Sequence, residues 1–81
     1  MDVITFKFKK LDYDKQRQIR RLANTNFNDN GGAARIRRWF EHEAAGVTVE
    51  FVRNSKFPEY VDDYKITMSK ENYVEFCLKW M

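Results

Sequence analysis

Hydrophobic and polar residues alternate with a period of two in three segments of the chain. These segments are residues 3–11, 47–52 and 64–68. A period of two is typical of a strand with one buried face and one wet face. The pattern therefore predicts three strands. Pro58, which has no backbone N–H to donate, falls between the second and third segments and predicts an ordered surface loop over residues 53–63.

Three other segments repeat hydrophobic residues at every third or fourth position, the spacing of an amphipathic helix. They are residues 14–27, 33–44 and 72–81. Asp12 and Ser69 precede the first and third of these segments and are expected to cap them with their short side chains. The polar stretch Asn24–Gly32 is typical of a turn and separates the first two helices. Gly46 is expected to stop the second helix.

The third predicted helix is apolar over most of its circumference. Its apolar residues are Tyr73, Val74, Phe76, Cys77, Leu78, Trp80 and Met81. Such a broad apolar surface predicts a helix that is mostly buried, with Cys77 as a small buried thiol.

The resulting order is β-α-α-β-β-α. Because each strand has one wet face, the helices are expected to cover the other face of the sheet. The fold prediction is therefore an α+β two-layer sandwich, with a three-stranded, mainly antiparallel sheet and three helices on one face. A chain of 81 residues, of which 16% are aromatic, suits a single domain over residues 1–81 with one small core of large rings.

Charge is distributed unevenly along the chain. Residues 1–40 contain ten Lys or Arg and four Asp or Glu, whereas residues 41–81 contain five and eight, which together give the formal net charge of +3. A basic first half favours an anionic partner, either a nucleic acid or a protein with an acidic surface.

The two predicted N-terminal helices contain the candidate partner-binding residues. These are Arg17, Arg20, Arg21, Arg35, Arg38 and Trp39. The arginines recur at three or four positions, so each helix is expected to present them on one side, where planar guanidinium groups suit phosphates and carboxylates. The alternative is that they only solvate their helices, some of them paired with Glu41 or Glu43.

Two groups of aromatic residues are also candidates for partner binding. Trp39 and Phe40 are neighbours on a helix, so one of them is expected at the edge of the core, where an exposed tryptophan would be a typical interface anchor. Phe6 and Phe8 alternate with Lys7 and Lys9, which resembles base-stacking sheets. Because the rings and the lysines point to opposite faces, the rings are expected in the core.

A possible anion contact precedes the second helix at Gly31, Gly32 and Arg35. Glycines before a helix let the backbone approach an anion, which the N–H groups and the helix dipole attract. The spacing is not that of a phosphate-binding loop, and the alternative is a flexible turn.

Little in the sequence indicates catalysis. His42 is the single histidine and Cys77 the single cysteine, so metal ligation, a Cys–His pair and a disulfide framework are not expected. We expect no enzyme activity, no cofactor and no membrane segment, and a reducing, cytoplasmic setting.

The last segment, residues 64–81, combines a strand, a polar turn and a closing helix that ends in Phe-x-Leu-Lys-Trp. It resembles the tail of small, mostly uncharacterised accessory proteins of T4-like tailed bacteriophages. The resemblance implies a viral accessory protein and carries no functional residues. We therefore expect a non-enzymatic binding protein that modulates or inhibits a host or viral macromolecular machine. The alternatives are a nucleic-acid-binding protein that uses the same arginines and a structural virion or assembly component, with the oligomeric state open.

Overall fold

The computed structural model describes residues 2–80 and has the predicted order of elements. The elements are β1 (Val3–Lys7), a 3-10 turn η1 (Phe8–Lys10), α1 (Tyr13–Asn26), α2 (Gly32–Glu43), β2 (Thr48–Arg53), β3 (Val61–Ser69) and α3 (Lys70–Trp80). The predicted contribution of Met81 to the last helix lies outside the described residues.

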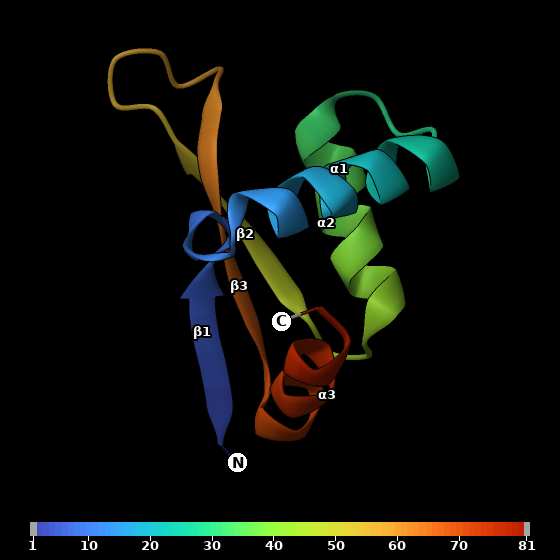
Figure 1. Ribbon diagram of the computed structural model, residues 1–81. Coiled ribbons are helices and arrows are strands. Elements are labelled where there is room, and N and C mark those ends of the chain that lie inside the picture. Colours follow the sequence, from blue (N-terminus) through green and yellow to red (C-terminus); the bar gives the residue numbers. More distant parts are fainter. Residues whose placement is uncertain (1, 81) are drawn as a thin grey trace.

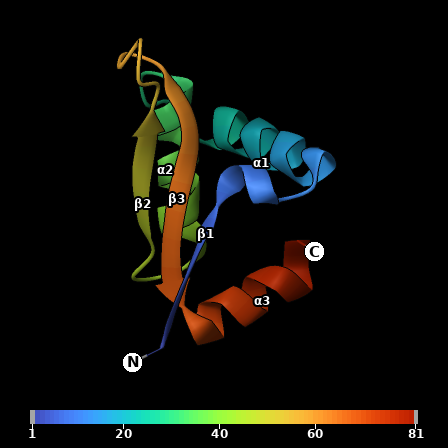
Figure 2. The same ribbon diagram turned by 90° about the vertical axis from the view of Figure 1, so that its left-hand side faces the viewer.

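The three strands form one antiparallel sheet in the order β1-β3-β2, so the long strand β3 lies in the centre. All three helices lie on the same side of this sheet (Figure 1). Viewed from its other side, the sheet lies in front of α2, and none of the helices within residues 2–80 covers that side (Figure 2). The predicted two-layer α+β architecture is confirmed.

The core lies between the sheet and the helices. Its most buried residues are Phe8, Leu11, Ile19, Ala23, Ile36, Trp39, Phe40, Val49, Tyr64, Ile66, Met68 and Phe76. The ring of Phe8 stands edge-on to Phe40 of α2 and Tyr64 of β3, with centroids 6.2 and 5.5 Å away. Such edge-to-face pairs stabilise a core beyond the area that they bury. The predicted inward orientation of Phe8 is confirmed.

The first strand is shorter than its alternating pattern predicts. It ends one residue before Phe8, where the chain turns into η1, and the amide of Leu11 donates to the carbonyl of Phe8 at 3.1 Å. Asp63 of β3 accepts the amide of Lys9 at 3.1 Å, so a side chain replaces a ladder hydrogen bond there. The prediction of a strand up to Leu11 is therefore wrong beyond β1.

The helices start near the predicted positions, and one of the two predicted N-cap residues forms its capping hydrogen bond. Ser69 accepts the amide of Asn72 at 3.2 Å, the predicted cap of α3. Asp12 occupies the N-cap of α1, but its side chain forms no capping hydrogen bond. The amide group of Gln16 instead reaches back to the carbonyl of Leu11 at 2.8 Å, and this bond fixes the entry into α1.

The end of α2 and the burial of α3 differ from their predictions. Helix α2 ends at Glu43, and Gly46, with a φ of 76°, lies in the turn that follows and not directly at the helix end. Helix α3 extends away from the sheet past the edge of β1 (Figure 2), so only one side of it meets the core. Val74 and Leu78 are exposed and Cys77 is only half-buried, so the prediction of a mostly buried helix is wrong.

Strands β2 and β3 are joined by residues 54–60, a shorter loop than predicted because both strands extend further. Asn54 organises this loop. Its side-chain oxygen accepts the amides of Lys56 and Phe57 at 2.8 and 2.9 Å, and its amide group donates to Asp62 at 3.1 Å. The loop is thus held by the side chain of Asn54 together with backbone hydrogen bonds and a bond from Arg53 to the carbonyl of Pro58.

Candidate partner-binding surface

The three arginines of α1 are gathered on one exposed surface. Arg17, Arg20 and Arg21 line a surface hollow of about 380 Å³ together with Asp14 and Gln18. Among residues 2–80, none of these three guanidinium groups forms an ion pair. The structure therefore brings together the three predicted arginines of α1 and leaves their charges available. We call the residues that line this hollow the α1 surface: Asp14, Arg17, Gln18, Arg20 and Arg21.

Two of these arginines also contact aromatic rings. The guanidinium carbon of Arg17 lies 5.9 Å from the ring centre of Tyr13, a residue whose side chain is 69% exposed. Arg20 lies 5.5 Å from the ring centre of Phe8 and so covers one side of the core. Burial raises the pKa of Tyr64 behind it, and the positive charge of Arg20 opposes that rise. Arg20 therefore contributes to packing as well as to the surface charge.

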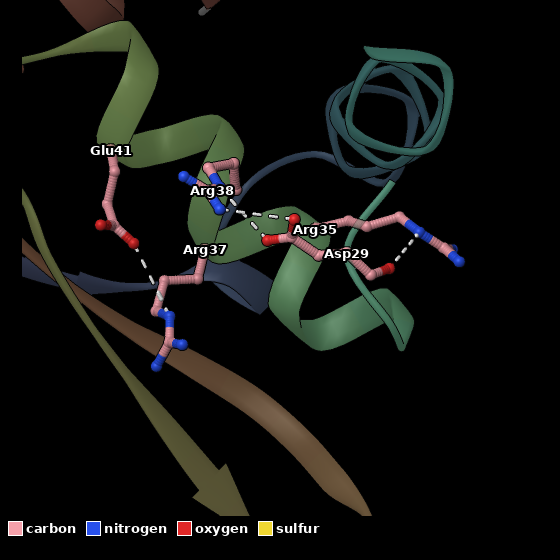
Figure 3. Close-up of polar contacts among 5 residues, drawn as sticks. All are labelled: Asp29, Arg35, Arg37, Arg38 and Glu41. Carbon is pink, nitrogen blue, oxygen red and sulfur yellow. Dashed lines mark hydrogen bonds and ion pairs between the residues drawn. The ribbon is translucent and has the colours of Figure 1, made fainter. Parts of the chain in front are cut away.

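The α2 arginines are engaged within the chain (Figure 3). Arg35 donates through Nε to the carbonyl of Asp29 at 3.0 Å and through Nη1 to the side chain of Asn24 at 3.1 Å. Arg38 pairs with the Asp29 carboxylate, its Nε 3.2 Å from Oδ2. Both side chains thus hold the turn between α1 and α2. Of the five predicted arginines, the three of α1 therefore share one surface, and Arg35 and Arg38 are directed to the turn.

The partner of Arg38 also differs from the sequence prediction. Arg38 pairs with Asp29 and not with Glu41 or Glu43, because the turn folds back over the start of α2 (Figure 3). Glu41 pairs instead with Arg37, one helical turn earlier, at 3.6 Å. This ion pair is exposed on both sides, so it contributes little to stability.

Gly31 and Gly32 form a structured turn at the start of α2. Gly31 occupies the N-cap with a φ of 89°, a conformation that favours glycine, and its carbonyl accepts the amide of Arg35 at 3.3 Å. The Arg35 side chain is directed back to Asp29 of the preceding segment. The anion contact at Gly31, Gly32 and Arg35 stays a prediction, whereas the turn itself has a clear structural role.

Trp39 does not lie at the edge of the core, and the prediction that it or Phe40 would do so is wrong. Its side chain is 3% exposed, and Phe40 is 1% exposed. Both are buried because α2 is flanked on two sides. Phe40 contacts Phe8 in the core between the sheet and the helices. Trp39 packs against Trp80 of α3, with ring centroids 5.2 Å apart. Trp39 therefore has too little exposed surface to anchor a partner.

Tyr13 is the exposed aromatic residue that the sequence reasoning missed at this surface. Tyr13, Arg17 and Arg21 are spaced four residues apart, so they form one ridge along α1. An aromatic residue at the start of a helix with arginine four positions later was the signal that could have identified it.

The bare face of the sheet has no base-stacking platform. Its strand residues alternate with the buried ones and are Val3, Thr5, Lys7, Thr48, Glu50, Val52, Asp63, Lys65, Thr67 and Ser69. None of these residues of the described strands is aromatic. Lys7 pairs in register with Lys65, whose other neighbour is Glu50, so the local charge is mixed. Binding of stacked bases on this face is therefore not supported.

The remaining reactive side chains have packing contacts. The ring of His42 lies 5.8 Å from that of Phe27, and Cys77 sits half-buried on α3.

Across residues 2–80, no helix combines the length and apolar composition required to span a membrane. Comparison with models of protein families, with curated proteins and with solved structures found no match for this chain.

Proposed function

We propose that this chain is a non-catalytic binding domain that contacts an acidic protein surface through α1. One observation carries the proposal. The guanidinium groups of Arg17, Arg20 and Arg21 have no carboxylate partner among the described residues, whereas Arg37 and Arg38 of α2 each have one. Unpaired arginines that line a shared hollow are free to form bidentate bonds with a partner's carboxylates.

The composition of the α1 surface favours a protein over a phosphate backbone. Tyr13 is exposed beside Arg17, and tyrosine and arginine are, with tryptophan, the residues enriched at the centres of protein interfaces. Asp14 lines the same hollow and would repel a continuous run of phosphates. A protein surface, which mixes charges and polar groups, can accommodate all of these side chains.

Nucleic acid is the second candidate, and one observation favours it. The segment that leads into the α1 surface is rich in lysine, with Lys7, Lys9 and Lys10 exposed and Lys15 half-buried. A cationic strip of this kind can follow a phosphate backbone, and its binding would weaken steeply with salt.

We further propose, from the resemblance of residues 64–81 to phage accessory proteins, that the partner belongs to a host or viral machine in the host cytoplasm, which the domain would modulate or inhibit. The cytoplasmic setting is part of the proposal. It is supported by the single cysteine, Cys77, which is free. A virion or assembly role remains the third hypothesis, and it requires stable self-association that light scattering would detect.

The test uses two double variants with the same change in charge. Arg17→Glu with Arg21→Glu reverses two charges on the α1 surface. Lys56→Glu with Lys65→Glu reverses two charges on the exposed loop and the bare sheet face. Each variant, and the unmodified chain, is titrated against labelled duplex DNA and single-stranded RNA by fluorescence anisotropy, and is used for crosslinking capture from a host lysate.

The proposal predicts no anisotropy change at low salt, and capture of an acidic protein that the arginine variant loses and the lysine variant keeps. Tight, salt-dependent nucleic-acid binding that the arginine variant loses would establish the second candidate instead. Capture that survives in the arginine variant would overturn the role of α1.

A further inference from the structure

A second hollow, separate from the α1 surface, lies where the end of α1 meets the end of α2. It has a volume of about 330 Å³ and is lined by Asn26, Phe27, Trp39, His42 and Glu43. This volume is at the lower end of the range for small-ligand sites, about 300–1,000 Å³. It shares no lining residue with the hollow on α1.

Aromatic rings supply most of its walls. The rings of Phe27 and His42 lie 5.8 Å apart at an angle of 65°, so they form a corner. Trp39 forms a rigid floor, since it is held between Phe40 and Trp80 with ring centroids 4.9 and 5.2 Å away. The faces of Phe and Trp rings, here Phe27 and Trp39, carry negative charge density and attract cations, while His42 completes the wall by its shape.

The electrostatic surroundings favour the same sign of ligand. Helix α1 ends at Asn26 and α2 ends at Glu43, so the negative ends of two helix dipoles meet at the hollow. The Glu43 carboxylate adds a negative charge, which its ion pair with Lys79 partly neutralises. Lys79 pairs with one of its oxygens, Oε2, at 3.2 Å and leaves the other oxygen without a hydrogen-bond partner among the described residues.

The lining does not suit a metal ion. It offers one carboxylate, the imidazole of His42 and one side-chain amide oxygen, whereas calcium takes about six to eight oxygen ligands and zinc about three or four Cys, His or carboxylate ligands. Among residues 2–80, no group of three or more His, Cys, Asp or Glu is placed to hold a metal. Rings beside a single carboxylate suit a bulky, weakly hydrated cation instead.

We propose that this hollow binds an alkylated ammonium group, with Phe27 and His42 as its aromatic walls and Glu43 as its counter-charge. The group can come from a small molecule such as choline or from a methylated lysine of a protein. The proposal is independent of the function assigned to α1, because the two sites have different residues and ligands of opposite charge.

The test compares choline chloride with 3,3-dimethylbutan-1-ol, a neutral molecule of the same shape. Each is titrated into the labelled protein at constant ionic strength while backbone amide and tryptophan indole signals are followed by NMR. A peptide with one trimethyllysine, and the same peptide with unmodified lysine, separate the two sources of the ligand. Sodium chloride alone controls for ionic strength.

Choline is expected to shift the signals of Phe27, His42 and the Trp39 indole and to bind more tightly than its neutral isostere. Phe27→Leu, which keeps apolar volume and removes the ring, should weaken choline binding by about threefold to thirtyfold. Phe57→Leu, which removes an exposed ring from the loop at 54–60, is the matched control and should leave binding unchanged.

Three results would overturn the proposal. One is equal binding of choline and the neutral isostere, and another is an absence of shifts for both choline and the trimethyllysine peptide. The third is unchanged choline binding in Phe27→Leu, provided that its circular dichroism spectrum matches that of the unmodified chain. Preference for the peptide over choline would assign the site to a methylated protein partner.

Discussion

Replacing Trp39 with alanine distinguishes a core residue from an interface anchor. If Trp39 were an exposed anchor, Trp39→Ala would remove binding and leave the free energy of unfolding nearly unchanged. The structure predicts the opposite, because the indole is 3% exposed and lies against Phe40 and Trp80. Its removal would leave a cavity at the junction of α2 and α3.

The size of the effect follows from burial. Truncation of a buried Phe or Trp to alanine costs about 3–5 kcal/mol, through lost transfer free energy and the cavity that remains. Folded domains have unfolding free energies of about 0.05–0.15 kcal/mol per residue, hence about 4–12 kcal/mol for a chain of this length. Trp39→Ala should therefore remove a large part of the stability, and the more conservative Trp39→Phe should remove less.

Urea unfolding followed by far-ultraviolet circular dichroism measures this loss. With a slope of about 1–3 kcal/mol per molar urea for small proteins, a loss of 3 kcal/mol moves the midpoint by about 1–3 M. Leu78→Ala is the matched control, since Leu78 is 84% exposed and its truncation should change the unfolding free energy by no more than about 0.5 kcal/mol. A loss below about 1 kcal/mol in Trp39→Ala would refute its assignment to the core.

Three further predictions concern the turn, the loop and the buried tyrosine. Gly31→Ala should lower the unfolding free energy by about 1–3 kcal/mol, because an alanine at a φ of 89° is strained, as thermal unfolding would measure. Asn54→Ala should speed amide hydrogen exchange in the loop at 54–60, because two backbone amides lose their acceptor. Burial raises the pKa of Tyr64 above its unfolded value, so its stabilising contribution is complete below about pH 10 and is lost as the pH rises through the folded pKa. Alkaline unfolding of Tyr64→Phe should accordingly be less steep.

Each of these predictions has a direct counter-result. Gly32→Ala is the control for the turn, because Gly32 has no positive φ and open space around it, so equal losses at Gly31 and Gly32 would exclude backbone strain as the cause. Unchanged exchange in Asn54→Ala would mean that backbone hydrogen bonds alone hold the loop. Identical alkaline profiles for Tyr64→Phe and the unmodified chain would show that another group controls the transition.

The sequence was sufficient for the layers of the fold because the sheet has one bare face. Alternation is visible only where one side of a strand meets water, as it does at Val49 and Glu50 of β2. The ends of β3 were missed for a local reason. Asp62 and Asp63 are poor strand formers, yet β3 includes both, because Asp63 accepts the backbone amide of Lys9 and Asp62 accepts the side-chain amide of Asn54.

The candidate site was predictable only within one helix. Helical spacing alone places Arg17 and Arg21 on the same side of α1. The role of Arg38 depends on the path of the turn that presents Asp29, and the burial of Trp39 depends on the position of α3. The first contact crosses a turn between residues nine positions apart, and the second joins two distant segments, so the periodic pattern within a helix carries no signal for either.

The central position of β3 has a consequence for how the chain folds during synthesis. The hydroxyl groups of Thr5 and Thr67 lie 3.1 Å apart across β1 and β3, although 62 positions separate them. Strand β1 therefore leaves the ribosome long before its partner, whereas β2 and β3 pair through a short loop. Until β1 docks, one edge of β3 stays open to any strand of matching sequence. Refolding at high protein concentration should thus yield domain-swapped dimers, in which each copy donates β1 to the other.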